Sequence, residues 1–468
     1  MAIDKKFQVI FFLVIGFLIL IFIFSKYRIN SRATIQKANL RINAGKITKP
    51  LPFNWKAFAQ GGEETGVRML GNVIPQIAGF SPRYIRIDHI YDFYQVVSRD
   101  INNNLQLNWD LLDQTVCDIY HTGARPFFSL GYMPPALSKD GSLVSPPSNW
   151  VDWSYLVQKT IERYSGINTR LCGQVTGDWL KDIYYEVWNE PDLETFGKWS
   201  IYGGDKDYKT LYYYSVLGAS KAKNVYQFLI GGPATTAAYK NWFQYFLNYL
   251  NKNNLRIDFL SWHHYSKNPD DFRDDVEKIN FWLSDFPYNR YLSLPKIISE
   301  WAYDSNPNPV AETDLGATHS LMVIKNLIEQ NLEMAFAFEI KDGPTPSWGI
   351  LSYDGQKKPR FYALKFLNLL GRNRLEVDGE GSYVKALASQ GYNKISAIII
   401  NYDPEEKNKE LVPVTFFNLD PGSYQLSIYD LKSENPLTSV VTISNGQYRR
   451  FFDMSPNSAY AIELIKLN

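Results

Sequence analysis

The sequence has few cysteines and almost no net charge, and both features exclude classes of protein. Its 468 residues contain only two cysteines, Cys117 and Cys172, and 49 basic residues stand against 48 acidic ones. The two cysteines allow one disulfide at most, and nothing in the sequence shows whether they meet. They do not fit the spacing of a metal site. The balanced charge, without a basic stripe, gives no reason to expect a nucleic-acid partner.

Repeats, low-complexity tracts and a glycine-rich nucleotide loop are also missing from the sequence. No G-x-G-x-x-G run follows the first expected strand, which argues against an open dinucleotide-binding α/β sheet. Aromatic residues are abundant instead, at 15%, with 12 tryptophans and 32 tyrosines. Aromatic faces stack on the apolar C–H surfaces of sugar rings, so this composition suits a carbohydrate partner. Aromatic side chains also fill large cores, and composition alone does not separate the two interpretations.

An apolar stretch stands near the start of the chain. Phe7–Phe24 is interrupted only by Gln8 and Gly16, and as a helix it spans about 27 Å, close to the thickness of a bilayer core. No small-residue cleavage site follows, so we predict an uncleaved transmembrane helix within an anchor over residues 1–30. More lysines and arginines follow the stretch than precede it. By the positive-inside rule this opposes the extracytoplasmic main domain that we nevertheless expect.

Short β-like runs alternate with segments of helical periodicity from residue 53 to residue 371. Eight strands alternating with helices predict a closed (β/α)8 TIM barrel, which is an α/β fold. The expected strands are 55–59, 84–87, 125–130, 183–188, 228–231, 259–263, 296–299 and 334–338. The expected helices are 109–120, 153–164, 208–225, 242–250, 275–286 and 318–330.

The segments on either side of this region have a different pattern. Residues 31–52 are polar and mixed, which is typical of a tether or a lead-in strand. After Gly371, short β-like runs are separated by turn signals such as Asp420-Pro421-Gly422. Residues 372–468 therefore predict a C-terminal β-sandwich module.

Two strands of the expected barrel end in a glutamate. Tyr184–Leu193 reads Y-Y-E-V-W-N-E-P-D-L and delivers Glu190 to the end of the fourth strand, where Pro191 stops it. Lys296–Trp301 reads K-I-I-S-E-W and places Glu300 at the end of the seventh. Strands four and seven of a closed barrel face each other across its C-terminal mouth. The two carboxylates can then lie about 5–5.5 Å apart, the separation used in retaining glycoside hydrolysis.

These two runs resemble glycoside hydrolase family 39. The resemblance rests on N-E-P at the end of strand four together with S-E-W at the end of strand seven, and it covers about residues 55–370. The family includes β-xylosidases, α-L-iduronidases and membrane-tethered hydrolases of exopolysaccharides. The resemblance implies that Glu190 is the general acid/base and Glu300 the nucleophile. This chemistry needs neither a metal nor another cofactor.

The resemblance also implies residues that bind the sugar or hold the nucleophile. Asn189 is expected to donate to the sugar 2-hydroxyl, although a local turn role is open. Arg86, in the second strand, is expected to keep Glu300 ionised, with an ordinary salt bridge in the barrel core as the alternative. Tyr265 is expected to direct its hydroxyl at the nucleophile, and His264 to contact the sugar.

Two tryptophans are candidates for the platform under the sugar ring. Trp301 and Trp348 flank the ends of strands seven and eight, and core packing is nearly as good an interpretation of each. We interpret Glu186, in the fourth strand, as a structural charge inside the barrel rather than a catalytic group.

The function predicted from these patterns is a membrane-anchored, retaining glycoside hydrolase. Its expected substrate is a cell-envelope or extracellular polysaccharide, and the anchor suggests a partner in exopolysaccharide synthesis or export. A non-catalytic carbohydrate-binding or scaffold protein on the same barrel is the alternative. The intact pair of glutamates argues against this alternative, because a decayed enzyme usually loses one of them.

Overall fold

A computed structural model describes residues 35–61, 64–285 and 287–467. Eight parallel strands close into a barrel in the order β10-β11-β12-β13-β2-β3-β6-β9. The ring is closed because β9 pairs with β10, and because β13, the last barrel strand in the sequence, pairs with β2, the first. The predicted TIM barrel is confirmed. The strands are β2 (Ala57–Gln60), β3 (Tyr84–Ile87), β6 (Arg125–Leu130), β9 (Ile183–Val187), β10 (Phe228–Thr235), β11 (Phe259–Tyr265), β12 (Lys296–Ala302) and β13 (Met334–Phe338).

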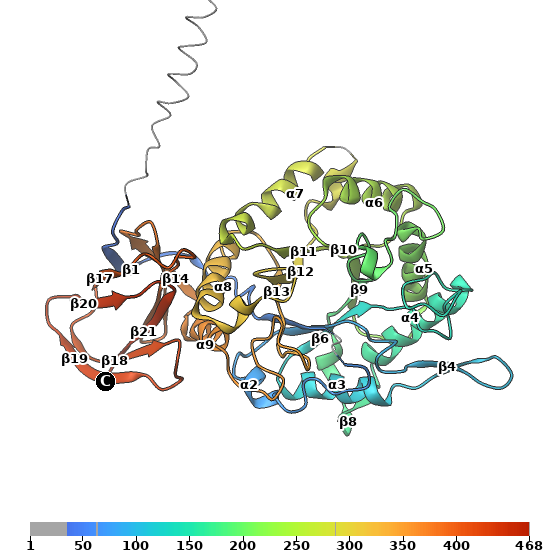
Figure 1. The fold of residues 1–468 in the computed structure, drawn as a ribbon, viewed down its shortest axis with the longest axis horizontal. Helices are drawn as coiled ribbons and strands as arrows, with labels where there is room; N and C mark the ends of the chain where they lie inside the picture. The colour runs from blue at the N-terminus through green and yellow to red at the C-terminus, as the bar shows by residue number, and fades with distance from the viewer. Residues whose placement is uncertain (1–34, 62–63, 286, 468) are drawn as a thin grey trace, which may run out of the picture.

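Helices surround this barrel on its outside (Figure 1). The α-helices are α2 (Ile74–Ala78), α3 (Asp110–His121), α4 (Trp150–Tyr164), α5 (Tyr208–Lys221), α6 (Lys240–Asn253), α7 (Asp275–Leu283), α8 (Asp314–Leu327) and α9 (Pro359–Phe366). The 3-10 helices are η1 (Gly177–Leu180), η2 (Glu194–Phe196), η3 (Pro269–Arg273), η4 (Tyr288–Tyr291), η5 (Pro309–Glu312) and η6 (Leu367–Leu369).

The barrel strands are buried on both faces, which explains why their sequences are so apolar. β12 reads K-I-I-S-E-W-A and is buried at every position, because one face meets the barrel interior and the other meets the helices. Two of the helices, α4 and α5, begin where a polar side chain satisfies a free backbone N–H group. Asn149 accepts from the backbone of Val151 at the start of α4, and Asp207 accepts from that of Lys209 at the start of α5.

A cluster of apolar side chains fills the N-terminal half of the barrel interior. It is made of inward-facing side chains from the N-terminal parts of the strands, and its members pack in one buried cluster. The cluster contains Ala57, Ala59, Tyr84, Phe127, Tyr184, Phe259, Ile297, Met334 and Phe336. The polar side chains of the interior consequently lie above this cluster, toward the C-terminal mouth.

The C-terminal module is a nine-stranded sheet beside the barrel, on the left in Figure 1. Its order is β19-β18-β21-β16-β15-β14-β1-β17-β20. The strands are β1 (Leu40–Pro50), β14 (Asn373–Asp378), β15 (Val384–Gly391), β16 (Lys394–Asn401), β17 (Glu410–Phe417), β18 (Gly422–Asp430), β19 (Leu437–Ile443), β20 (Gln447–Met454) and β21 (Ser458–Lys466).

The sheet-rich module is confirmed, but its strands differ from the expected sandwich in two respects. They form one hydrogen-bonded sheet rather than two, because β1 pairs with β14 on one side and β17 on the other. This β1 comes from the segment interpreted as a tether or a lead-in strand. Side chains near both edges of the sheet, such as Phe452 and Tyr424, share one buried cluster, so the sheet curls around its own core.

Small elements outside the barrel were not expected from the sequence. Two hairpins, β4 (Val97–Arg99) with β5 (Leu105–Leu107) and β7 (Arg170–Leu171) with β8 (Gln174–Val175), project from the barrel loops. Cys117 in α3 and Cys172 in the turn between β7 and β8 form a disulfide. The question that the sequence left open is thereby answered.

The predicted membrane anchor is corrected. No helix within the described ranges is long and apolar enough to cross a bilayer. The stretch Phe7–Phe24, on which the prediction rested, lies outside those ranges. The expected membrane contact and the expected partner in synthesis or export both depended on that anchor and lose their basis with it.

Candidate active site

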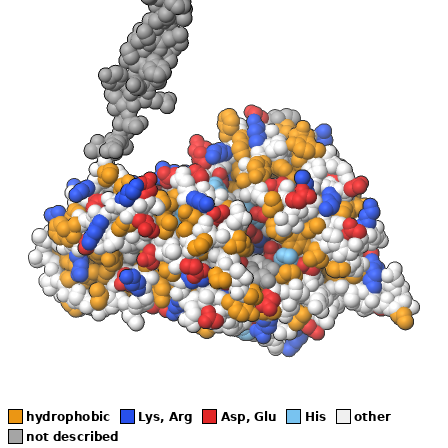
Figure 2. Space-filling view, viewed as in Figure 1, with side chains coloured by type: hydrophobic (Ala, Val, Ile, Leu, Met, Phe, Trp, Pro, Cys, Tyr) orange, Lys and Arg blue, Asp and Glu red, His pale blue; other side chains and the backbone are white. Residues whose placement is uncertain are grey.

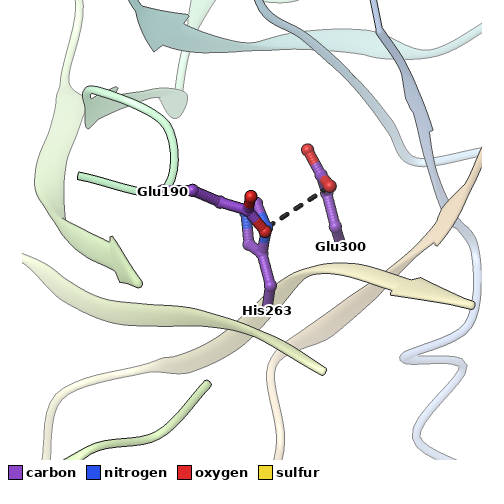
Figure 3. A group of neighbouring side chains, drawn as sticks. All are labelled: Glu190, His263 and Glu300. Carbon is purple, nitrogen blue, oxygen red and sulfur yellow. Dashed lines mark hydrogen bonds and ion pairs between the residues drawn. The ribbon is translucent and has the colours of Figure 1, made fainter. Parts of the chain in front are cut away.

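Glu190, His263 and Glu300 meet at the C-terminal mouth of the barrel (Figure 3). Glu190 follows β9, while His263 and Glu300 belong to the adjacent strands β11 and β12. One carboxylate oxygen from each glutamate and one imidazole nitrogen all lie within 4.8 Å of one another. His263 and Glu300, which come 73 and 110 positions after Glu190 in the sequence, thus share one site with it.

The backbone at Glu190 has an unusual conformation for a residue with a side chain. Its φ is +40°, in the left-handed region, and its N–H donates to the carbonyl of Ala234 at 2.9 Å. A non-glycine residue in this region costs on the order of 1 kcal/mol or more and persists only where its surroundings hold it. The bend turns the Glu190 side chain toward the axis of the barrel just before Pro191 ends the segment.

His263 links the two glutamates, and the sequence analysis missed it. Its Nδ1 lies 2.8 Å from Oε1 of Glu190 and 3.3 Å from Oε2 of Glu300. Burial lowers the pKa of the imidazole, but the negative charges of Glu300 and Glu190 outweigh this, and the net pKa is raised above its usual value. The imidazole therefore favours its protonated form, which offsets the repulsion between the two carboxylates.

Arg86 in β3 is fully buried and donates to three side chains. Its Nε donates to Glu186 at 2.8 Å, its Nη1 to Glu300 at 2.6 Å and its Nη2 to Asn189 at 2.7 Å. The contact with Glu300 that the resemblance implied is present. So is the salt bridge with Glu186, which lies inside the barrel away from the mouth. One guanidinium therefore fixes the positions of two carboxylates and one amide.

Tyr265 donates its hydroxyl to the other oxygen of Glu300, at 2.6 Å. Burial and the charge of Glu300 raise the pKa of Tyr265 well above its usual value, so this group stays a neutral donor. Burial also raises the pKa of Glu300 itself, while the positive charges of His263 and Arg86 act against that rise. The ionised form of Glu300 thus depends on these partners.

Asn189 is held from both ends of its amide. Its Oδ1 accepts from Arg86, and its Nδ2 donates to the hydroxyl of Tyr132 at 2.8 Å. These two bonds fix the orientation of the amide and leave one N–H of Nδ2 for another acceptor. Tyr132, which lies just after β6, was not anticipated from the sequence.

A cavity of about 760 Å³ opens above these groups. Figure 2 shows this face of the molecule, hollowed over the barrel. His264 and Trp348, both expected at the sugar, lie in the cavity wall. The described residues that line it are Asp88, Asn189, Glu190, Leu193, Thr195, Phe196, Thr236, Ala237, Tyr239, His264, Tyr265, Glu300, Ser305, Asn306, Phe338 and Trp348.

Trp301 does not reach the cavity, so it is not the expected platform. Its side chain is only 1% exposed and packs under the guanidinium of Arg360, 5.2 Å from the ring centre. Neighbouring residues of a strand point to opposite faces, so the inward direction of Glu300 sends Trp301 outward into the layer of helices.

The trio of Glu190, His263 and Glu300 is also the group in the described part of the chain that could hold a metal ion. The sequence analysis had found no third ligand beside the histidines. In this structure Nδ1 of His263 hydrogen-bonds to Glu190 and lies within ion-pair distance of Glu300, so the imidazole supplies a positive partner to both carboxylates.

A closed (β/α)8 barrel with two carboxylates less than 5 Å apart at its C-terminal mouth defines the class: the protein is a retaining glycoside hydrolase. Residues 67–276 match the family model described as glycosyl hydrolases family 39. Over these residues the chain is similar to that family.

Related proteins agree with that assignment. The chain is 26% identical over 377 residues to a β-xylosidase of Geobacillus stearothermophilus, covering 70% of each sequence. Its fold is similar to that of the family 39 enzyme of Xanthomonas axonopodis pv. citri, at 18% identity and a TM-score of 0.78, with 94% of this chain and 100% of that one covered. A bacterial orthologue of human α-L-iduronidase has a TM-score of 0.71 at 16% identity, with 92% and 84% covered.

Proposed function

We propose that Glu300 is the nucleophile and Glu190 the general acid/base of a double-displacement glycosidase. The observation that carries the proposal is the closeness of the two carboxylates around His263. An inverting enzyme needs roughly 6.5–9.5 Å between its carboxyl groups to admit a water, and the retaining reaction needs about 5–5.5 Å. Oxygens within 4.8 Å of each other support the retaining geometry.

In the first half-reaction, an oxygen of Glu300 attacks the anomeric carbon. The bond to the leaving oxygen breaks while Glu190 gives that oxygen its proton, and a glycosyl ester of Glu300 forms. Arg86 and Tyr265 hold Glu300 in place and favour its ionised form before the attack. In this proposal the remaining N–H of Asn189 donates to the sugar 2-hydroxyl, and the fixed orientation of its amide supports that role.

In the second half-reaction, Glu190 acts as a base on water. The water attacks the anomeric carbon, its proton goes to Glu190, and the ester bond to Glu300 breaks to release the sugar and restore both carboxyl groups. Glu190 enters this stage as a carboxylate, because its proton has left with the departing oxygen, and esterification has removed the negative charge of Glu300 beside it.

The proposed substrate is a cell-envelope or extracellular polysaccharide, or an oligosaccharide derived from one. The name of the curated relative, a β-xylosidase, supports a β-linked sugar such as xylose. The disulfide Cys117–Cys172 supports an oxidising compartment, where such polymers occur.

Separate variants of the two glutamates test the proposal. On 4-nitrophenyl β-D-xylopyranoside and related aryl glycosides, we expect Glu190→Gln to lower kcat by roughly 10²- to 10⁴-fold and Glu300→Gln to abolish turnover. A 2,4-dinitrophenyl glycoside, whose leaving group needs no acid, should still release a burst from Glu190→Gln and none from Glu300→Gln. A 2-fluoro-xylosyl fluoride should label Glu300, as read by mass spectrometry of peptides.

Glu333→Gln is the matched control, because Glu333 forms a surface pair with Arg83 before β13, at the opposite end of the barrel. It should retain wild-type kcat. Wild-type turnover in both active-site variants would contradict the mechanism. Saccharide binding without any product, on a broad panel of glycosides, would instead favour the non-catalytic alternative.

A further inference from the structure

Asp88 is a buried carboxylate in the cavity wall that the proposed mechanism does not use. It directly follows β3, is 7% exposed and lines the cavity that contains Glu190 and Glu300. Its Oδ1 is buried and has no hydrogen-bond partner among the residues that the structure describes. A buried ionisable oxygen without a partner is costly, and native proteins keep such groups mainly where function requires them.

The cations nearest to Asp88 along the chain are already engaged elsewhere. The Nε, Nη1 and Nη2 atoms of Arg86 each donate to another side chain. His89 has its Nδ1 bonded to Asp92 at 2.7 Å, and its ring stacks on Phe93. Neither side chain donates a hydrogen bond to Oδ1 of Asp88, which therefore stays unpaired in the cavity wall.

The wall of the cavity is acidic as a whole. Asp88, Glu190 and Glu300 line it, while none of its described residues is a lysine or an arginine. His264 is in the wall too, but its Nδ1 lies 2.5 Å from the carboxylate of Asp275. A sugar that carries a carboxylate of its own would meet the carboxylates of Asp88 and Glu300, and no lysine or arginine, among the described residues of this wall.

We propose that Asp88 determines substrate specificity by accepting hydrogen bonds from hydroxyl or amino groups of a non-anionic sugar, and that the site rejects glycosides of uronic acids. This inference rests on the proposed function and narrows its substrate class. Relatives and structural neighbours of the chain include both a β-xylosidase and an α-L-iduronidase orthologue, whose names refer to a neutral and an acidic sugar respectively. The acidic wall favours a neutral sugar, the kind to which the name of the β-xylosidase refers.

The experiment compares the wild-type full chain with Asp88→Asn and Asp88→Ala. The substrates are 4-nitrophenyl β-D-xyloside, its 2-, 3- and 4-deoxy analogues, 4-nitrophenyl β-D-glucosaminide and 4-nitrophenyl β-D-glucuronide. Loss of a hydrogen bond to a charged acceptor corresponds to roughly a 10- to 100-fold fall in kcat/KM. We expect that fall for Asp88→Ala on the parent xyloside, and no fall on the deoxy analogue that lacks the hydroxyl in contact with Asp88.

Three further readouts make the result specific. The wild type should not hydrolyse the glucuronide, and Asp88→Asn should narrow the preference for the xyloside over the glucuronide. A larger effect of Asp88→Asn on the glucosaminide than on the xyloside would assign the contact to an amino group. Asp178→Asn is the control, because Asp178 is 81% exposed in η1, before β9 and away from the mouth. It should retain wild-type kcat/KM.

The proposal is overturned if Asp88→Ala is fully active, if it loses the same factor on every deoxy analogue, or if the wild type prefers the glucuronide. Failure of the proposed function gives a different pattern, in which no glycoside is hydrolysed by any variant. In that case, binding of free D-xylose, D-glucosamine and D-glucuronate to the full chain is compared by saturation-transfer NMR. Stronger binding of D-glucuronate, or binding unchanged in Asp88→Ala, would then overturn the role of Asp88.

Discussion

Arg86 is the side chain on which the charge balance of the cavity depends. It is the partner of Glu186 inside the barrel and of Glu300 at the mouth, and it also orients Asn189. Breaking a buried ion pair by removing one partner leaves an uncompensated charge, which is far more costly than losing a surface pair. Structure and reactivity therefore depend on the same guanidinium.

We expect Arg86→Met to lower the free energy of unfolding by about 3–5 kcal/mol. Because a positive charge beside a carboxylate lowers its pKa, the substitution should raise the pKa of Glu300 further. The acid limb of the kcat/KM profile should then move to higher pH. Denaturant unfolding and a pH series on an aryl glycoside measure the two effects. Arg83→Met, in an exposed pair with Glu333, is the control and should change stability by about 0–1 kcal/mol.

His263 gives a second expectation, which concerns stability against pH. The pKa of His263 is raised in the folded protein, so its charged form stabilises the fold fully below the unfolded value of 6.5. This contribution is lost as pH rises through the raised pKa. The difference in melting temperature between wild type and His263→Asn should therefore be largest near pH 6 and should shrink at higher pH. A difference that grows with pH would show that the imidazole is neutral.

Strand-end motifs and the family resemblance explain which site residues the sequence revealed. Glu190, Glu300, Arg86 and Tyr265 were identified from motifs, and the structure brings all four together. Side chains alternate between the two faces of a strand. Applied to β11 and β12, this rule would have placed His263 on the inward face with Tyr265 and would have turned Trp301 outward. The positions of Asp88 and Tyr132 in the site could not be predicted in this way. These residues follow β3 and β6, and the geometry of the loops there decides whether their side chains enter the mouth.

The barrel strands were predictable because their signal is local. All eight expected runs coincide with observed strands to within a few residues, since each is a short apolar run bounded by turn residues. The hairpins β4–β5 and β7–β8 carry no such pattern, because they are short and exposed. The pairing of Cys117 with Cys172 depends on how α3 lies against the β7–β8 turn, and no local pattern reports that.

The disulfide should stabilise the attachment of these elements. It joins residues 55 positions apart, and the loop-closure entropy removed from the unfolded chain corresponds to about 4 kcal/mol. We expect the double variant Cys117→Ser, Cys172→Ser to lose stability of that order in guanidinium unfolding, with unchanged KM once folded. Wild type treated with reductant should behave like the variant, and equal stability of the oxidised and reduced forms would contradict the expectation.

The C-terminal module is built from both ends of the described chain, because strand β1 belongs to its sheet. Leu40 and Ile42 are completely buried in the module core, and the strand lies between β14 and β17. These partners are more than 300 residues away in the sequence, so pairing could not be read from local pattern. Module side chains such as Leu387 and Ile400 also pack in the main cluster of the barrel. Barrel and module thus share a continuous core.

Removing β1 should therefore split the sheet rather than trim an edge. The pair β17–β20 is joined to the other strands of the sheet order only through β1. In a chain that begins at Leu51, we expect amide protons of 410–417 and 447–454 to exchange much faster than in a chain that begins at Ile35. Fully buried apolar side chains are each worth about 1.5–3 kcal/mol, so the loss of Leu40 and Ile42 also weakens the module core.

Hydrogen exchange with mass spectrometry measures this difference, and limited proteolysis locates any new cleavage site. The barrel strands serve as an internal control, because they pair with one another in a closed ring that omits β1. Their amides should stay protected in the shorter chain, and its kcat on an aryl glycoside should remain measurable. Equal protection of 410–417 in both chains would mean that the curled sheet is held by its side-chain core and does not need the pairing of β1 with β17.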